Sequence, residues 1–184
     1  MELTDNDKKK LLELAKKSIE SIYTKKDVDI DEYSNFSKKL GVFVTLTING
    51  NLRGCIGYPR PVYPLYEAVH RAAMAAAFED TRFEPLLEDE FKKTKIEISI
   101  LTEPKLIEVK DYTEYEKNIE LGKDGLIIEY GPNSGLLLPQ VPIDWGWNKT
   151  EYLENLSNKA GLGKDAWKEP GVKIYKFQSI IFEE

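Results

Sequence analysis

Residues 42–50 read Val42-Phe43-Val44-Thr45-Leu46-Thr47-Ile48-Asn49-Gly50. Aliphatic side chains occupy every second position from Val42 to Ile48, a period typical of a strand with one buried face. Asn49-Gly50 then supplies the two residues that a type I′ turn requires. The stretch therefore predicts a β-hairpin, with a return strand over residues 51–57.

Helical and extended patterns surround this hairpin. Thr4 and Asp7 form a capping pattern, and the apolar spacing that follows predicts an amphipathic helix of about five turns. Further along, we expect a helix from Pro64, a turn over 79–85, a short helix over 86–91 and a strand over 96–100. Residues 104–118 should be irregular or partly helical. After them we expect a hairpin of 125–130 with 136–140, a helix from Asn148 to Gly161 and a final strand over 172–181.

This order lacks the regular strand and helix alternation of a parallel sheet, so it predicts an α+β fold in which helices pack on an antiparallel sheet. The length of 184 residues indicates a single domain over 1–184. A content of 41% hydrophobic and 32% charged residues is that of a folded globular protein.

The formal net charge of −6 disfavours direct nucleic-acid binding, because a phosphate backbone meets net repulsion. The first residues mix acids and bases, so we expect no signal peptide. The longest apolar run, residues 72–78, is too short for a membrane span, and a lone free cysteine fits a reducing compartment. We therefore expect a cytoplasmic protein.

All four arginines, the only histidine and the only cysteine lie within residues 53–82, whereas all lysines lie outside this window. The planar fork of arginine grips carboxylates and phosphates, so the window indicates anion recognition. The competing interpretation is that Arg71 and Arg82 form structural pairs with Glu67, Glu79 or Asp80.

Arg53 and Cys55 stand two apart on the predicted return strand, so their side chains should leave the same face. A two-residue turn places Cys55 opposite Val44 and Arg53 opposite Leu46. A guanidinium beside the thiol would favour the thiolate, which makes Cys55 a candidate nucleophile or recognition thiol. The alternative is a buried, inert cysteine.

Three other residues extend this candidate site. Gly54 and Gly57 flank Cys55 and leave room for a ligand or another backbone to approach, or mark a bulge. His70 becomes a catalytic base only if the fold brings its helix onto the strand of Cys55; otherwise it is a histidine packed at the core boundary. One cysteine and one histidine do not make a metal site, and the sequence does not identify a cofactor.

Trp145 and Trp147 flank Gly146 and form either an aromatic platform for a partner or a cover for a sheet edge.

Residues 52–57, Leu52-Arg53-Gly54-Cys55-Ile56-Gly57, resemble the hallmark hexapeptide of the AMMECR-type domain family, named after the AMME chromosomal region gene. Supporting matches are Gly41-Val42-Phe43-Val44-Thr45-Leu46, Asp80-Thr81-Arg82-Phe83-Glu84-Pro85-Leu86, Ile96-Glu97-Ile98-Ser99-Ile100-Leu101, Gly125-Leu126, Leu137-Leu138-Pro139-Gln140-Val141 and Lys159-Ala160-Gly161-Leu162. The resemblance covers most of residues 40–165.

The resemblance implies an α+β fold of two unequal lobes with the hexapeptide near the cleft between them, and we expect the smaller lobe around residues 100–135. It implies no established biochemical activity. Microbial members resemble components associated with Memo-like and radical S-adenosylmethionine proteins and have been proposed as regulatory factors. Two departures from the family pattern are Thr81, where proline is common, and Ser157, where many microbial members have a second cysteine.

We therefore expect a recognition module that binds an anionic small molecule or a protein partner beside residues 52–57, through Arg53, Gly54, Gly57, Asp80 and Arg82. The alternative is an enzyme that uses Cys55 as nucleophile or group acceptor with His70 as base. A regulator that binds nucleic acid has the least electrostatic support.

Overall fold

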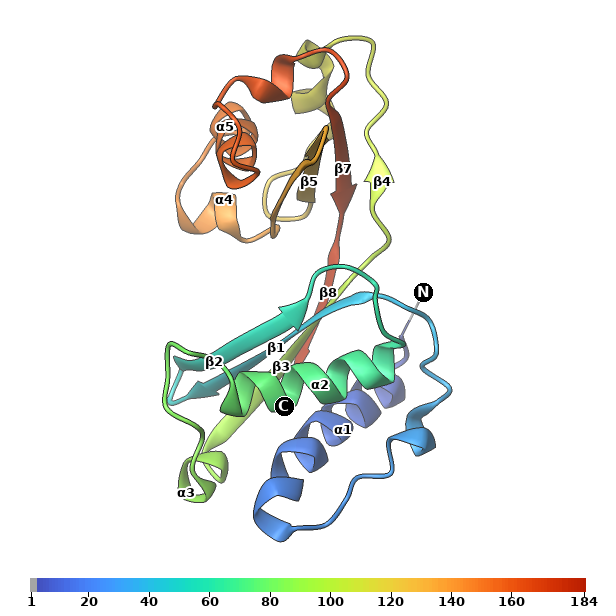
Figure 1. The fold of residues 1–184 in the computed structure, drawn as a ribbon, viewed down its shortest axis with the longest axis vertical. Coiled ribbons are helices and arrows are strands. Elements are labelled where there is room, and N and C mark those ends of the chain that lie inside the picture. The colour runs from blue at the N-terminus through green and yellow to red at the C-terminus, as the bar shows by residue number, and fades with distance from the viewer. Residues whose placement is uncertain (1–2) are drawn as a thin grey trace. The chain divides into compact units, whose positions relative to one another are not determined.

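The structure, a computed structural model, describes residues 3–184 and contains two units, the first made of residues up to Leu101 with Ile180–Glu184, the second of Thr102–Ser179 (Figure 1). The segment 100–135, where the smaller lobe is expected, falls largely in the second unit, which continues to Ser179. None of the helices in the described part of the chain is long and apolar enough to cross a membrane.

The first unit is a four-stranded sheet with two main helices. Its elements are α1 (Asp5–Thr24), the 3-10 helix η1 (Ile30–Tyr33), β1 (Gly41–Ile48), β2 (Asn51–Tyr58), α2 (Leu65–Phe78), α3 (Glu88–Phe91), β3 (Thr94–Leu101) and β8 (Ser179–Glu183). The sheet order is β2-β1-β3-β8, and β1 pairs antiparallel with β2 and β3. The predicted capping box of Thr4 and Asp7 is confirmed at the start of α1.

Helix α2 packs on β1 and β2, and α1 packs on α2 and β3. Figure 1 shows both helices on the same side of the sheet. The core includes the aliphatic positions predicted from the alternation, Val42, Val44 and Leu46, the alanine-rich face of α2, and the apolar faces of α1 and β3. Because these positions face the helices, the side chain of Thr45, which lies between them in the sequence, leaves the other face of the sheet.

The predicted hairpin is confirmed, but the predicted strand pairing is wrong from Arg53 onward. Ile48 pairs with Asn51 and Thr47 with Leu52, as a two-residue turn requires. The register then shifts, so Gly54 stands opposite Leu46 and Cys55 opposite Thr45. Arg53 is the extra residue of a β-bulge, which the alternation pattern does not reveal.

The second unit contains a second antiparallel sheet. Its elements are β4 (Lys105–Leu106), η2 (Tyr112–Asn118), β5 (Gly125–Tyr130), β6 (Asn133–Leu137), α4 (Val141–Asp144), α5 (Lys149–Lys159), η3 (Ala166–Lys168) and β7 (Lys173–Phe177), with the sheet order β4-β7-β5-β6. The predicted α+β class with antiparallel pairing and packed helices is thus confirmed, with two sheets in place of one.

Two predicted strands are corrected in this unit. The strand expected over 136–140 is β6, which starts at Asn133 because the turn is the tight Gly131-Pro132 rather than a longer loop. The final strand expected over 172–181 is interrupted at Gln178, whose N–H bonds Thr102 Oγ1 at 2.8 Å. Its two halves, β7 and β8, belong to different sheets.

A buried tyrosine fixes α5 in the second unit. Tyr152 is fully buried, and its hydroxyl lies 3.2 Å from the carbonyl oxygens of both Asp124 and Leu137. Burial raises the pKa of this phenol. The remaining core around it is aliphatic and aromatic: Ile107, Tyr115, Ile119, Leu126, Ile128, Leu153, Leu156, Trp167 and Ile174.

Candidate functional site

The bulge in β2 directs Arg53 to a carboxylate on α3. Arg53 Nε donates to Glu90 Oε1 at 3.0 Å and Nη2 donates to Oε2 at 2.9 Å, while Nη2 also donates to the Glu84 carbonyl at 2.9 Å. The Arg53 hydrogen bond, followed by that of the Leu87 N–H, lowers the pKa of Glu90 to about 2. The fork of Arg53 is therefore held by a bidentate internal partner.

Asp80 and Arg82 close the free edge of β2 at Cys55. The buried Asp80 carboxylate accepts the Cys55 N–H at 2.9 Å, and Arg82 Nη2 donates to the Cys55 carbonyl at 3.1 Å. Arg82 also holds Asp80 through Nε at 2.9 Å and Nη2 at 2.7 Å. Two side chains thus satisfy backbone groups that an edge strand otherwise leaves open.

This arrangement determines the charge of Asp80. The Arg82 hydrogen bond holds the pKa of the Asp80 carboxyl well below its usual range; burial opposes this effect, and the Cys55 N–H adds to it. The predicted structural pairing of Arg82 with Asp80 is confirmed, as is that of Arg71 with Glu67 at 2.8 Å.

The Cys55 thiol is hydrogen-bonded to a hydroxyl, and the Arg53 guanidinium expected beside it is paired elsewhere. Thr45 Oγ1 donates to Cys55 Sγ at 3.3 Å, and Cys55 is half-buried. The bulge accounts for this neighbour, because it moves Cys55 from the expected position opposite Val44 to one opposite Thr45. The hydrogen bonds of Arg53 go to Glu90 and Glu84.

The two glycines of residues 52–57 have close neighbours inside the protein. A Cβ on Gly54 would lie 2.1 Å from the Ala76 carbonyl oxygen of α2. A Cβ on Gly57 would lie 2.2 Å from the Val42 carbonyl oxygen of β1 and 2.5 Å from the Phe43 ring. The expected close approach of another backbone therefore applies to both glycines.

His70 and Cys55 are not brought together. His70 lies on α2, and its Nδ1 is 2.9 Å from Ser18 Oγ on α1. Because Ser18 Oγ donates its own proton to the Leu14 carbonyl at 2.6 Å, Nδ1 must carry the proton in this pair. Burial, followed by the charge of Arg71, lowers the pKa of His70. The Thr45 and Cys55 side chains lie on the other face of the sheet, so the structure forms no Cys-His pair.

An aromatic ring joins the two arginines of the site. The guanidinium carbons of Arg53 and Arg82 lie 5.8 and 5.6 Å from the centroid of the Phe83 ring. Two exposed leucines flank them: Leu52 precedes Arg53, and Leu87 donates its N–H to Glu90 at 3.0 Å. We call Leu52, Arg53, Arg82, Phe83 and Leu87 the hexapeptide surface.

A crevice elsewhere in the first unit involves none of the predicted site residues. It has a volume of about 440 Å³ and is lined by Lys17, Glu20, Ser21, Thr24, Lys26, Asp27, Val28, Asp29, Glu32 and Tyr33. Across residues 3–184, no three histidine, cysteine, aspartate or glutamate side chains are grouped so as to hold a metal ion.

The AMMECR1 family model matches residues 12–182, which include both units almost completely. The chain belongs to the AMMECR1 family. The hexapeptide, the Asp80 to Leu86 segment and the Leu137 to Val141 segment noted in the sequence all lie within the matched range.

Archaeal relatives cover nearly the whole chain. Protein MJ0810 of Methanocaldococcus jannaschii is 49% identical over 92% of this chain and 86% of its own length. Protein NEQ441 of Nanoarchaeum equitans is 44% identical over 95% of this chain and 98% of its own length. The crystal structure of uncharacterized protein PH0010 from Pyrococcus horikoshii aligns with a TM-score of 0.80 at 44% identity, covering 95% of this chain and 89% of that one.

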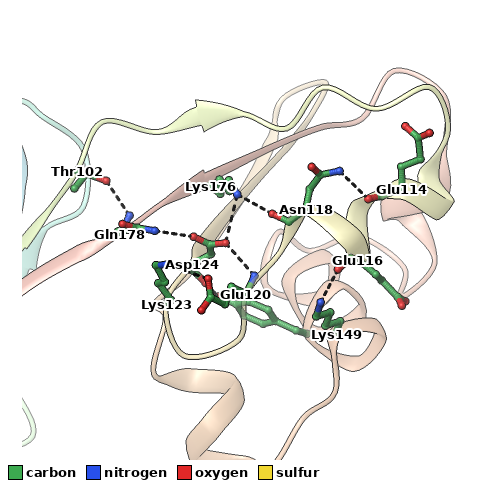
Figure 2. Close-up of polar contacts among 11 residues, drawn as sticks. Thr102, Glu114, Glu116, Asn118, Glu120, Lys123, Asp124, Lys149, Lys176 and Gln178 are labelled. Atoms are coloured by element: carbon green, nitrogen blue, oxygen red, sulfur yellow. Dashed lines mark hydrogen bonds and ion pairs between the residues drawn. The ribbon is translucent and has the colours of Figure 1, made fainter.

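This AMMECR1-family chain also contains a buried carboxylate that the sequence does not reveal. Figure 2 shows Asp124 at the start of β5, where Oδ2 accepts the Glu120 N–H at 2.9 Å and Oδ1 accepts from Gln178 Nε2 at 3.2 Å. Lys176 Nζ lies 3.5 Å from Asp124 Oδ2 and donates to the Asn118 carbonyl at 2.8 Å. The network ties the turn before β5 to β7. In the sequence, Asp124 is one acid among many.

Ser157, one of the two residues expected to depart from the family pattern, is fully buried in α5 and donates to the Leu153 carbonyl at 3.0 Å. Its hydroxyl is therefore already hydrogen-bonded within α5.

Proposed function

We propose that this AMMECR1-family chain is a recognition module that binds a protein partner through the hexapeptide surface, taking a segment in which acidic and apolar side chains alternate. The surface offers the exposed Arg82 guanidinium for a carboxylate and three apolar side chains, Leu52, Phe83 and Leu87, for the neighbouring residues of the segment. The Arg53 side chain is only 14% exposed and stays bound to Glu90. Arginine and aromatic residues are enriched in protein interfaces in this way.

One observation carries the proposal: the Arg82 guanidinium is fixed in position and still open to solvent. Asp80 and the Cys55 carbonyl hold its Nε and Nη2 atoms, but 54% of the side chain is exposed. Within residues 3–184, its Nη1 atom makes no hydrogen bond. A fork that is already ordered loses little conformational entropy when a carboxylate binds it.

The balance of charge favours a protein segment over a small free anion. Asp80 and Glu90 neutralise Arg82 and Arg53, so the surface has little net positive field to attract a phosphate or a small carboxylate. Apolar contact must therefore supply part of the binding free energy, and Leu52 and Leu87 are exposed for it. Memo-like and radical S-adenosylmethionine proteins, the classes that family resemblance implies, are the first partners to examine.

Arg82→Lys is expected to weaken binding about 10-fold, because lysine keeps the charge but loses the planar fork. The probe is a fluorescein-labelled peptide of three Glu-Leu repeats, and fluorescence anisotropy at near-physiological ionic strength measures its affinity. A matching peptide of Lys-Leu repeats should bind far more weakly to the unmodified protein.

Arg71→Lys is the matched control. Arg71 is also paired with a carboxylate, Glu67, and stacks on an aromatic ring, Tyr63, at 4.6 Å, but it lies on α2 outside the hexapeptide surface. Affinity should be unchanged in this variant, and also in Cys55→Ser. Equal losses for Arg71→Lys and Arg82→Lys would overturn the proposal, while dependence on the Cys55 sulfur would favour the enzyme interpretation.

A further inference from the structure

Two stacked tryptophans lie on the surface of the second unit. The rings of Trp145 and Trp147 are 6.0 Å apart between centroids and inclined by 20°. Trp145 is 71% exposed, and its neighbour Ile143 is 57% exposed. Of the two expectations from sequence, the partner platform fits the exposed ring of Trp145, because a tryptophan that covers a sheet edge would be largely buried. Trp147 is partly buried and packs against the core of the second unit.

The backbone holds this pair in place. The Trp145 N–H bonds the Val141 carbonyl at 3.1 Å, and the Trp147 N–H bonds the Pro142 carbonyl at 2.8 Å. Gly146 between them has φ +66°, a conformation that glycine adopts without strain. Immediately afterwards, Asn148 caps α5 in a reciprocal capping box. The exposed ring of Trp145 is thus presented from an ordered turn between two helices.

An unpaired carboxylate accompanies the exposed ring. Asp144 is exposed, and within residues 3–184 its side chain has no hydrogen bond or ion pair. Lys149 keeps its charge and donates to the Glu116 carbonyl at 2.8 Å, whereas Glu151 and Glu154 add negative charge. Lys123, which follows Gly122 beside Ile143, is paired with Glu120 at 3.0 Å. The surroundings of the tryptophans are therefore acidic, which repels nucleic-acid phosphates and attracts cations.

We propose that Ile143, Asp144, Trp145 and Trp147, here called the tryptophan platform, bind a basic segment of a partner protein. An arginine of that segment stacks its guanidinium on the exposed face of Trp145, where the ring quadrupole attracts a cation. Asp144, the next residue in the chain, provides the carboxylate for the same guanidinium. Ile143 contributes apolar contact to the arginine's methylene groups.

This site is independent of the hexapeptide surface. It belongs to the second unit, its residues are separate from those of the first site, and it selects the opposite charge. A failure at one site therefore leaves the proposal for the other intact.

The test is the binding of a fluorescein-labelled hexa-arginine peptide to the full chain, followed by fluorescence anisotropy. Trp145→Ala should weaken binding at least about 10-fold, and Trp145→Phe should recover most of the affinity, since it keeps an aromatic face. Asp144→Asn should weaken binding about 3- to 5-fold and reduce its dependence on salt. Because Trp145 is exposed, none of these changes should alter the fold, which circular dichroism verifies.

Tyr130→Ala is the matched control. Tyr130 is an exposed aromatic of the same unit that follows an acidic residue, Glu129, at the β5–β6 turn. Its loss should leave the affinity unchanged. Affinity for hexa-arginine that is retained in Trp145→Ala, or lost equally in Tyr130→Ala, would overturn the proposal. The proposal would also be overturned if the unmodified protein sediments as a dimer and Trp145→Ala sediments as a monomer, because a second copy of the chain would then cover the platform.

Discussion

Replacing Gly54 by alanine is expected to destabilise the protein by about 3 kcal/mol, because the new methyl group meets the backbone of α2. The Cβ would lie 2.1 Å from the Ala76 carbonyl oxygen and 3.1 Å from the carbonyl carbon. Neither atom can move unless helix and strand separate. Denaturant unfolding, followed by circular dichroism, measures the change in the free energy of unfolding.

Gly163→Ala is the control for this prediction. A Cβ at Gly163 has no atom within 4 Å, so the change in stability should stay within about 0.5 kcal/mol. A second test distinguishes backbone from side chain: Ala76→Gly should not rescue Gly54→Ala, because the clash is with the main-chain carbonyl. Rescue, or a Gly54→Ala variant as stable as the parent, would mean that α2 does not approach β2 as described.

Asp80→Ala is expected to destabilise the protein by about 3 kcal/mol, because it removes the acceptor for the Cys55 N–H and the partner of Arg82. Only 4% of the Asp80 side chain is exposed, so water cannot readily replace these contacts. Arg82, which is more than half exposed, regains part of its hydration, and this limits the loss. Denaturant unfolding near neutral pH provides the measurement.

The ion pairs of Asp80 and Glu90 predict that the fold loses stability in acid. Since the folded state lowers the pKa of both Asp80 and Glu90, it favours their charged forms. Their contribution to stability is complete above the ordinary pKa range near about pH 4 and is lost as the pH falls toward about 2. In Asp80→Ala this acid-dependent loss should become smaller.

Asp165→Asn serves as the matched control, because Asp165 also pairs with a cation close in the sequence, Lys168 at 2.6 Å, but both side chains of this ion pair are exposed. No measurable loss of stability is expected there. If Asp80→Ala proves as mild as Asp165→Asn, the carboxylate does not hold the 79–86 loop to the edge of β2.

The Asp80→Ala variant also bears on the proposed function. The loop that carries Arg82 and Phe83 is attached to β2 through Asp80, so a protein that retains its fold in Asp80→Ala should bind the Glu-Leu peptide more weakly. The stability of the first unit and the position of the hexapeptide surface therefore both depend on the contacts of Asp80 with Cys55 and Arg82.

Local patterns in the sequence predicted much of this fold. The alternation before Asn49-Gly50 predicted the first hairpin, and the capping residues Thr4 and Asn148 predicted the starts of α1 and α5. These features depend on residues within a turn or two of one another, where side-chain spacing and backbone preference decide the structure. The pairing of Arg82 with Asp80 is local in the same sense.

Only the tertiary structure decided what surrounds Cys55. Glu90, the partner of Arg53, is 37 residues away in the chain, and no sequence spacing selects it over the other acids. The bulge at Arg53 lets Gly54 face α2, and the break between β7 and β8 at Gln178 accompanies its hydrogen bond to Thr102. Local chemistry specifies which elements form, whereas contacts between distant segments specify which side chains meet, because burial and hydrogen bonding are settled only when those segments pack.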